Sequence, residues 1–231
     1  MDEFAAKRQA LLESGVRMMD PGAVYVEAGV TVGAGTLLLP GTILRGNTMV
    51  GENCEIGPNT MLTDCTVGDG AVINSSQCNE STIESGAHVG PFAYIRPNCH
   101  VGRDVKVGDF VELKNSTIGD GTKIAHLTYV GDADVGHRVN FGCGTVLVNY
   151  DGNRKYRTTI GDDCFIGCNT NLVSPVHVGD GAYTAAGSTI TEDVPADALA
   201  IARARQVEKP GWAAAHRAKN CLLYTSPSPR D

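Results

Sequence analysis

Residues 26–62 read VEAGVTVGAGTLLLPGTILRGNTMVGENCEIGPNTML, and an aliphatic residue returns at every sixth position of this stretch. The series opens with Val26, Val32 and Leu38; a glycine often follows the aliphatic residue, and a small residue usually stands two positions before it. An amphipathic helix would repeat its apolar positions after three or four residues, so a period of six excludes it. The period is also longer than simple strand alternation. Each hexad therefore predicts a short strand followed by a corner.

The same series continues through most of the chain. Its aliphatic positions are Val26, Val32, Leu38, Leu44, Val50, Ile56, Leu62, Val67, Ile73, Ile83, Val89, Ile95, Val101, Val107, Leu113, Ile118, Ile124, Val130, Val135, Phe141, Leu147, Ile160, Ile166, Leu172, Val178 and Ile190. Three hexads per coil predict a triangular prism with these side chains stacked inside and glycines relaxing the corners. We therefore expect an all-β fold over residues 21–200 that resembles the left-handed parallel β-helix of hexapeptide-repeat proteins.

The two ends of the chain do not follow the repeat. Residues 1–20 predict a short linker helix, because Phe4 and Leu11 lie at helical spacing and Gly15 ends the run. Residues 201–219 are expected to form a basic C-terminal arm. Residues 220–231 carry no repeat, and we expect them to be a non-native tail.

Composition narrows the class of protein. The 231 residues carry a formal net charge of −7, which argues against a nucleic-acid partner, since phosphate contacts need a basic face. The sequence contains neither an apolar run long enough for a membrane helix nor a signal peptide, so we expect a cytoplasmic protein without a membrane partner. The eight cysteines form no CxxC pair and the histidine spacings do not suit zinc; we expect reduced, mostly buried thiols and no metal site.

The places where the repeat breaks are candidates for function. Arg96 and Lys114 replace the usual glycine and lie 18 residues, or one coil, apart, so two cations should stack at one edge and favour an anion such as a phosphate. Ile160 follows Leu147 after 13 positions instead of six, so seven extra residues form a loop here. This loop carries the cations Arg154, Lys155 and Arg157. His126 stands beside Tyr129, and Glu112 lies one coil below Tyr129. The alternative is an ordinary solvated surface with a decorative loop.

Four stretches point to one family: GPFAYIRP (90–97), GDFVELKNSTIGDGTKIAHLTYVGDADVG (108–136), VNFGCGTVLVNYDGNRKYRTTIGDDCFIG (139–167) and ALAIARARQVEKPGW (198–212). Together they resemble the C-terminal half of bacterial bifunctional N-acetylglucosamine-1-phosphate uridyltransferase / glucosamine-1-phosphate acetyltransferase. The resemblance covers about residues 1–215. The family's N-terminal pyrophosphorylase domain has no counterpart here, so we expect a separated acetyltransferase half.

The resemblance implies transfer of an acetyl group from the co-substrate acetyl-CoA to the amine of glucosamine 1-phosphate. The product, N-acetylglucosamine 1-phosphate, would serve UDP-N-acetylglucosamine and peptidoglycan synthesis. The resemblance also implies a homotrimer with active sites between subunits, and acetyl transfer that needs no metal.

Individual residues take roles from the same resemblance. His126 matches the general base, a role that suits a side chain titrating near neutral pH, and Glu112 would orient its imidazole. Asn149 and Tyr150 match positions that touch the acetyl group, where a backbone N–H could stabilise the oxyanion. The sugar-phosphate pocket would comprise Arg96, Lys114, Tyr129, Asn140 and Lys155. The acetyl-CoA contacts would be Cys143, Asn149, Tyr150, Cys168, Ala186 and Arg203.

The sequence departs from the family at two positions, and two other functions are weighed against the one that the resemblance implies. Cys143 replaces a usual alanine and Cys168 a usual serine, which puts a hydroxyl hydrogen bond in doubt. Another hexapeptide acyltransferase would use a different amine or hydroxyl acceptor, whereas the Arg96–Lys114 pair favours a phosphate. A non-catalytic ice-binding scaffold would need flat threonine arrays; the threonines here, six apart, fall on successive faces, and that alternative fails.

Overall fold

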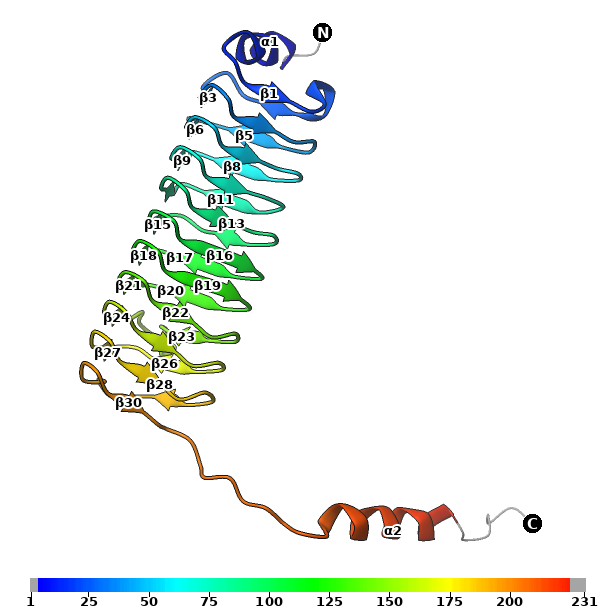
Figure 1. The fold of residues 1–231 in the computed structure, drawn as a ribbon, viewed down its shortest axis with the longest axis vertical. Coiled ribbons are helices and arrows are strands. Elements are labelled where there is room, and N and C mark those ends of the chain that lie inside the picture. Colours follow the sequence, from blue (N-terminus) through cyan, green and yellow to red (C-terminus); the bar gives the residue numbers. More distant parts are fainter. Residues whose placement is uncertain (1–3, 225–231) are drawn as a thin grey trace.

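The computed structural model describes residues 4–224, of which residues 220–224 are described by their backbone alone. The chain winds into a prism with three parallel sheets, here named A, B and C, of 11, 10 and 9 strands (Figure 1). Neighbouring strands in each sheet come from successive coils of the chain. The predicted parallel β-helix of hexapeptide repeats is therefore confirmed.

The strands are two to four residues long, as short hexads require. Sheet A contains β1 (Arg17–Met18), β4 (Leu37–Leu38), β7 (Glu55–Ile56), β10 (Val72–Ile73), β13 (His88–Val89), β16 (Lys106–Asp109), β19 (Lys123–His126), β22 (Asn140–Phe141), β25 (Phe165–Ile166), β28 (Tyr183–Thr184) and β30 (Leu199–Ala200). Sheet B contains β2 (Tyr25–Val26), β5 (Ile43–Arg45), β8 (Met61–Thr63), β11 (Gln77–Asn79), β14 (Tyr94–Ile95), β17 (Glu112–Lys114), β20 (Tyr129–Gly131), β23 (Val146–Val148), β26 (Asn171–Val173) and β29 (Thr189–Ile190). Sheet C contains β3 (Thr31–Val32), β6 (Met49–Val50), β9 (Thr66–Val67), β12 (Thr82–Ile83), β15 (His100–Val101), β18 (Thr117–Ile118), β21 (Ala133–Val135), β24 (Thr158–Ile160) and β27 (His177–Val178).

The core of the prism is the aliphatic series. Every predicted aliphatic position from Val26 to Ile190 is buried, and parallel pairing places each one above its counterpart in the next coil. Between Val26 and Ile190, two inward strand positions escaped the aliphatic count because they are not aliphatic. Cys78 is buried between Leu62 and Ile95, and Thr184 lies below Ile166. The hexad pattern therefore predicts both the strands and the direction of their side chains.

The three edges of the prism carry different residues at the corners where the strands end. We call them the A/B, B/C and C/A edges, after the sheets that meet there. At the end of each strand, the residue two positions after the inward side chain stands at an edge of the prism. The residues at this position in successive coils lie one above the other. For sheet A this position holds Asp109, His126, Cys143, Cys168 and Ala186, which together define the base strip along the A/B edge.

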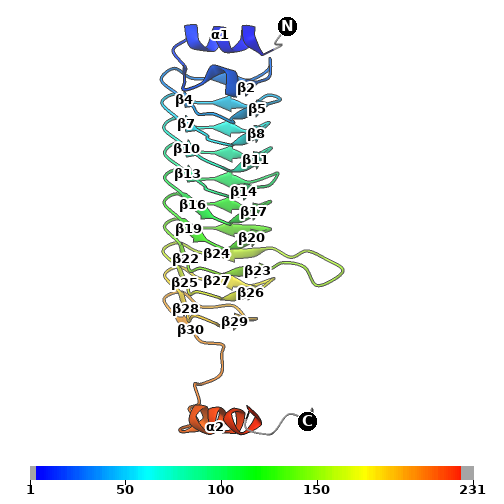
Figure 2. The ribbon, with the colours of Figure 1, turned by 90° about the vertical axis from the view of Figure 1, so that its right-hand side faces the viewer.

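The ends of the chain differ in part from the prediction. Helix α1 (Ala5–Glu13) buries Leu11 and covers the first coil, but strand pairing already begins at β1, before the expected boundary at residue 21. A short 3-10 helix, η1 (Pro21–Ala23), leads into the second sheet. After β30 the exposed arm leads to α2 (Trp212–Tyr224), which lies apart from the prism (Figures 1 and 2). This helix crosses the expected boundary at residue 219. Over the described residues, neither helix has the length and apolar character needed to cross a membrane.

Candidate active site

His126 and Asp109 meet at the A/B edge. Strands β16 and β19 are parallel neighbours that bring Asp109 into register with His126, and the imidazole Nδ1 lies 2.7 Å from Asp109 Oδ1. The histidine side chain is 59% exposed, so it can meet a ligand from solution. The hydrogen bond with the imidazole is the chief reason that the pKa of Asp109 is below its usual value. The pair is therefore an exposed histidine whose Nδ1 side is held by a carboxylate.

Glu112 does not take the orienting role that we expected for it. Its Oε1 accepts a hydrogen bond from Arg96 Nη1 at 2.8 Å, and this contact is the main cause of the raised pKa of Arg96. Glu112 lies on sheet B in register with Tyr129, whereas His126 lies on sheet A in register with Asp109. Asp109 holds the imidazole instead. The signal in the sequence was its position 17 residues, one coil, before His126.

Below His126, the base strip holds three of the six residues predicted to contact acetyl-CoA, whereas Asn149 and Tyr150 lie at the B/C edge. The N–H of Asn169 donates to Cys143 O, and that of Gly187 to Cys168 O, both at 2.8 Å, so these corners stack directly. Ala186 occupies the next coil. Arg203 follows at the lower end, with its Cδ beside Gly187. The structure thus lines up Cys143, Cys168, Ala186 and Arg203 along the edge that His126 heads.

A second group of predicted residues lies at the B/C edge. Because Ile95 pairs with Leu113, the following residues Arg96 and Lys114 occupy one edge in successive coils. Lys155 from the loop approaches Lys114, and its ammonium group is the largest reason that the pKa of Lys114 lies below its usual value; partial desolvation acts the same way. We call Arg96, Lys114 and Lys155 the cation cluster. Three cations held together without an equal number of anions favour binding of an anion.

A buried carboxylate forms the floor beside these cations. Asp132 accepts hydrogen bonds from the side-chain amides of Asn115 at 2.6 Å and Asn149 at 2.5 Å. The Asn149 amide also lies 3.5 Å from Tyr129 Oη. The negative charge of Asp132 raises the pKa of Lys114 and so partly offsets the lowering caused by Lys155. This arrangement joins Tyr129 and Asn149 to the cation cluster.

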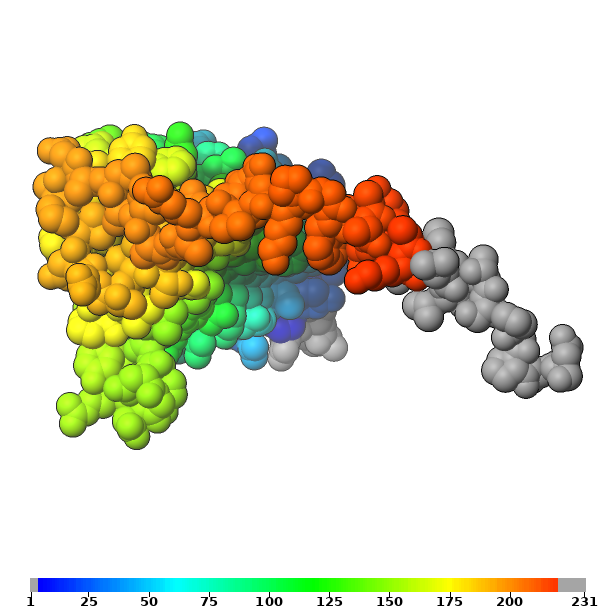
Figure 3. Space-filling model, turned by 90° about the horizontal axis from the view of Figure 1, so that it is seen from below, coloured from blue at the N-terminus to red at the C-terminus, as the bar shows by residue number. Residues whose placement is uncertain are grey.

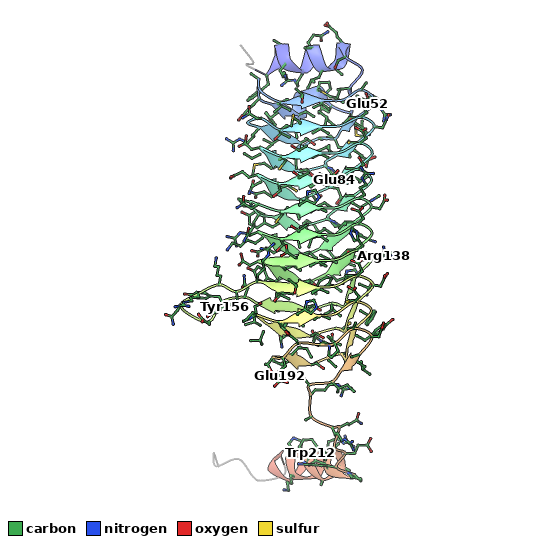
Figure 4. The ribbon with its side chains drawn as sticks, turned by 90° about the vertical axis from the view of Figure 1, so that its left-hand side faces the viewer. Glu52, Glu84, Arg138, Tyr156, Glu192 and Trp212 are labelled. Atoms are coloured by element: carbon green, nitrogen blue, oxygen red, sulfur yellow. The ribbon has the colours of Figure 1, made fainter. Side chains whose placement is uncertain are left out.

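The loop of residues 149–157 leaves the prism between β23 and β24 and projects from the B/C edge, where Figure 4 labels Tyr156 (Figures 2, 3 and 4). The Asp151 carboxylate accepts the backbone N–H groups of Asn153 and Arg154, each at 2.7 Å, which fixes the turn. Arg157 is an anchor, because its guanidinium binds Asp134 and the Ala133 carbonyl. One of the three predicted loop cations therefore holds the loop itself.

The backbone at the start of this loop bears on the expected oxyanion contact. The Asn149 N–H donates to the Leu147 carbonyl at 3.1 Å, so it is already engaged. Tyr150 bridges to Lys155 in an antiparallel pair, and its side-chain hydroxyl donates to the Gly152 carbonyl. Of the two expected N–H groups, that of Tyr150 is the better candidate.

One chain does not gather all the predicted residues. The base strip lies on the A/B edge and the cation cluster on the B/C edge, so the width of sheet B separates them. Asn140 lies on the outer face of sheet A, in register with Lys123 and Phe165, and away from the cation cluster. The candidate residues form two half-sites.

An exposed apolar ladder runs beside the His126–Asp109 pair and was not anticipated. Phe92, Phe110 and Leu127 occupy the A/B corner in successive coils, each with positive φ (58°, 56° and 46°) and more than half exposed. The rings of Phe92 and Phe110 stack with centroids 5.5 Å apart. Bulky residues seldom adopt this conformation, and contiguous exposed apolar groups mark contact surfaces. Hydrophobic periodicity could not reveal them, because they lie outside the inward series.

One family model and several curated proteins match this chain in sequence. The family model for bacterial transferase hexapeptide (six repeats) matches residues 29–64, 80–115 and 157–192. Bifunctional protein GlmU of Clostridium perfringens (strain SM101 / Type A) is 57% identical over 201 residues, which cover 87% of this chain and 44% of the relative. The chain is similar to bifunctional GlmU. The GlmU protein of Clostridium botulinum (strain Langeland) is 51% identical over 199 residues, with 86% and 44% covered.

The chain thus spans less than half the length of these curated relatives. Among solved structures, an Arabidopsis UDP-N-acetylglucosamine acyltransferase is 14% identical with a TM-score of 0.49, covering 94% of this chain and 85% of that one. Within the described residues, no group of three or more His, Cys, Asp or Glu side chains is placed to hold a metal ion.

Proposed function

We propose that the chain is an acetyltransferase that moves an acetyl group from acetyl-CoA to the amine of glucosamine 1-phosphate. The observation that carries the proposal is the exposed His126–Asp109 pair at the head of the base strip. The similarity to GlmU proteins at 57% and 51% identity supports the same reaction. The resemblance implies His126 as the base, and its exposure and its contact with Asp109 support that role.

In this proposal His126 accepts a proton from the attacking nitrogen while Asp109 holds the imidazole in place. The amine attacks the thioester carbonyl, the N–C bond forms, and the C–S bond breaks to release CoA as its thiol. A well-placed base contributes roughly 10²- to 10⁴-fold to such a step. The Tyr150 N–H is the candidate donor to the oxyanion that forms on the carbonyl oxygen.

The cation cluster would hold the phosphate. Lys114 and Lys155 repel each other in the free protein, as the lowered pKa of Lys114 indicates. A phosphate placed between them would offset this repulsion and accept charge-assisted hydrogen bonds. An acceptor that lacks the phosphate would leave the repulsion in place. The cluster would therefore select glucosamine 1-phosphate over glucosamine.

A homotrimer would unite the two half-sites. The base strip of one subunit would face the cation cluster of its neighbour, and three-fold symmetry would repeat this contact around a closed ring. The exposed ladder of Phe92, Phe110 and Leu127 lies next to the base strip, so the same contact would cover it. The separation of the half-sites within one chain is the reason to expect this assembly.

Thiol release from acetyl-CoA tests the reaction. The purified chain should release CoA with glucosamine 1-phosphate, at a much higher kcat/KM than with glucosamine, and should do so in EDTA. The same protein should make no UDP-N-acetylglucosamine from UTP and Mg²⁺. Equal rates with both acceptors would contradict the phosphate role, and no thiol release with either would contradict the function.

A further inference from the structure

Two cysteines of the base strip differ from the others that the structure describes. Cys54, Cys65, Cys78, Cys99 and Cys164 are buried, and burial raises the pKa of each thiol. Such thiols are poor nucleophiles, because the thiolate is the reactive form. Cys143, by contrast, is partly exposed and Cys168 is exposed. Both stand on the surface of the prism, at the edge that His126 heads.

The two thiols occupy equivalent places in successive coils. Phe141 pairs with Ile166 in sheet A, and each cysteine follows two residues later. The hydrogen bond from Asn169 N to Cys143 O, at 2.8 Å, shows that the register continues through the corner. Paired strands lie about 4.8 Å apart. That spacing falls within the roughly 4.4–6.8 Å between Cα atoms that a disulfide spans.

The corner around Cys143 can adjust to bring the two sulfur atoms together. Gly142 and Gly144 flank it, and Gly144 has a φ of 77°, which glycine adopts without steric cost. The backbones are already closely apposed, because a side chain at Gly142 would meet the backbone of Cys168. The backbone therefore holds the two cysteines close enough for rotation of their side chains to join the sulfur atoms.

We propose that Cys143 and Cys168 form a redox-active dithiol that is oxidised reversibly to an intramolecular disulfide by low-molecular-weight disulfides. The Cys168 thiolate attacks one sulfur of the small disulfide, and the other sulfur leaves as a thiolate that takes up a proton. The Cys143 thiolate then attacks the Cys168 sulfur and releases the second small thiol. The protein loses two electrons and two protons, and the small disulfide gains them.

The position of the dithiol gives the oxidation a consequence that rests on the proposed function. Cys143 lies one coil below His126, and Cys168 one coil further, along the strip proposed for acetyl-CoA. A disulfide between them would turn both side chains across the strip and remove the surface on which the co-substrate lies. Oxidation would then lower acetyl transfer, and reduction would restore it.

Peptide mapping after treatment with oxidised glutathione tests the linkage independently of activity. A Cys221→Ser background is used, because Cys221 lies outside the side chains that the structure describes. A non-reducing digest should join the peptides that contain Cys143 and Cys168, and dithiothreitol should separate them. Acetyl transfer should fall at least tenfold with the linkage and recover on reduction.

Two single variants provide matched controls. Cys143→Ala and Cys168→Ser, in the same background, should each acquire one glutathione without an internal linkage. Glutathione adducts on both cysteines of the parent without a linked peptide would overturn the dithiol, and a linked peptide with unchanged activity would overturn its effect on acetyl transfer. If the reduced parent shows no acetyl transfer, the proposed function fails, while the linkage is still decided by mass.

Discussion

The A/B and C/A edges of the prism use the same place in the repeat for different purposes. His126 stands two residues after the inward Ile124, and His137 two residues after the inward Val135. On the C/A edge, His137 Nδ1 accepts the backbone N–H of Asp120 at 2.9 Å. On the A/B edge, His126 Nδ1 faces the Asp109 carboxylate. One histidine completes the scaffold, and the other is the exposed residue that we propose as the base.

The C/A edge as a whole is a ladder of side chains that hold the coils together. The carboxylates of Asp69, Asp120, Asp162 and Asp180 each accept a backbone N–H from the coil above, at 2.8 Å. Figure 4 labels Glu52, Glu84 and Arg138 on this side of the prism. The A/B edge instead presents a histidine, two thiols and apolar rings to solvent. Side chains that the repeat does not use are free for binding and catalysis.

Replacing the two equivalent histidines should break this comparison most clearly. His126→Ala should lower kcat by roughly 10²-fold or more, because the base is lost. His137→Ala should leave kcat within about twofold and lower the free energy of unfolding by about 1 kcal/mol, for one hydrogen bond. Steady-state kinetics and urea unfolding check both variants. Equal losses of kcat would show that the two edges do not differ in function.

The cation cluster gives the next largest effect. Lys114→Ala should raise the KM for glucosamine 1-phosphate by roughly 10- to 100-fold, since a hydrogen bond to a charged group contributes about 1.5–3 kcal/mol. The KM for acetyl-CoA should change little. Lys123→Ala is the matched control, because Lys123 is an exposed lysine on sheet A. A similar rise in both KM values for Lys114→Ala would indicate a general structural defect.

Asp109 and Glu112 can be told apart by their kinetics. Asp109→Asn should lower kcat by roughly tenfold, because the imidazole loses the carboxylate that orients it. Glu112→Gln should act mainly on the KM for glucosamine 1-phosphate, since Glu112 holds Arg96. Measuring both parameters for both variants decides the matter. A larger kcat loss for Glu112→Gln would restore the role first expected for it.

The smallest effect concerns the protonation of Lys114. Its folded-state pKa is lowered chiefly by Lys155, so between that pKa and the ordinary lysine value the unfolded chain binds more protons. Stability should therefore rise with pH through this window, and Lys155→Ala should flatten the rise. NMR of dimethylated lysines should show the Lys114 pKa moving up toward its ordinary value in Lys155→Ala. An unchanged pKa would exclude Lys155 as the cause.

The sequence predicts the prism well because one physical requirement, burial of an aliphatic residue every six positions, repeats along it. It also predicts that Arg96 and Lys114 stack, since their separation equals one coil. It does not predict Asp109 as the partner of His126, because coils of 16, 17 and 18 residues follow one another in no regular order and the edge position depends on the count. Nor does it predict Phe92 or Phe110 at positive φ, a conformation that the apolar pattern does not encode.

The central claim is that each active site joins the base strip of one subunit to the cation cluster of another. Subunits carrying His126→Ala and subunits carrying Lys114→Ala, with different affinity tags, can be co-expressed and the mixed oligomers isolated. Each mixed trimer should have one of its three sites restored, because a site needs an intact strip from one subunit and an intact cluster from its neighbour. Activity no greater than the average of the two parent variants would contradict the account, since it would place both half-sites within one chain.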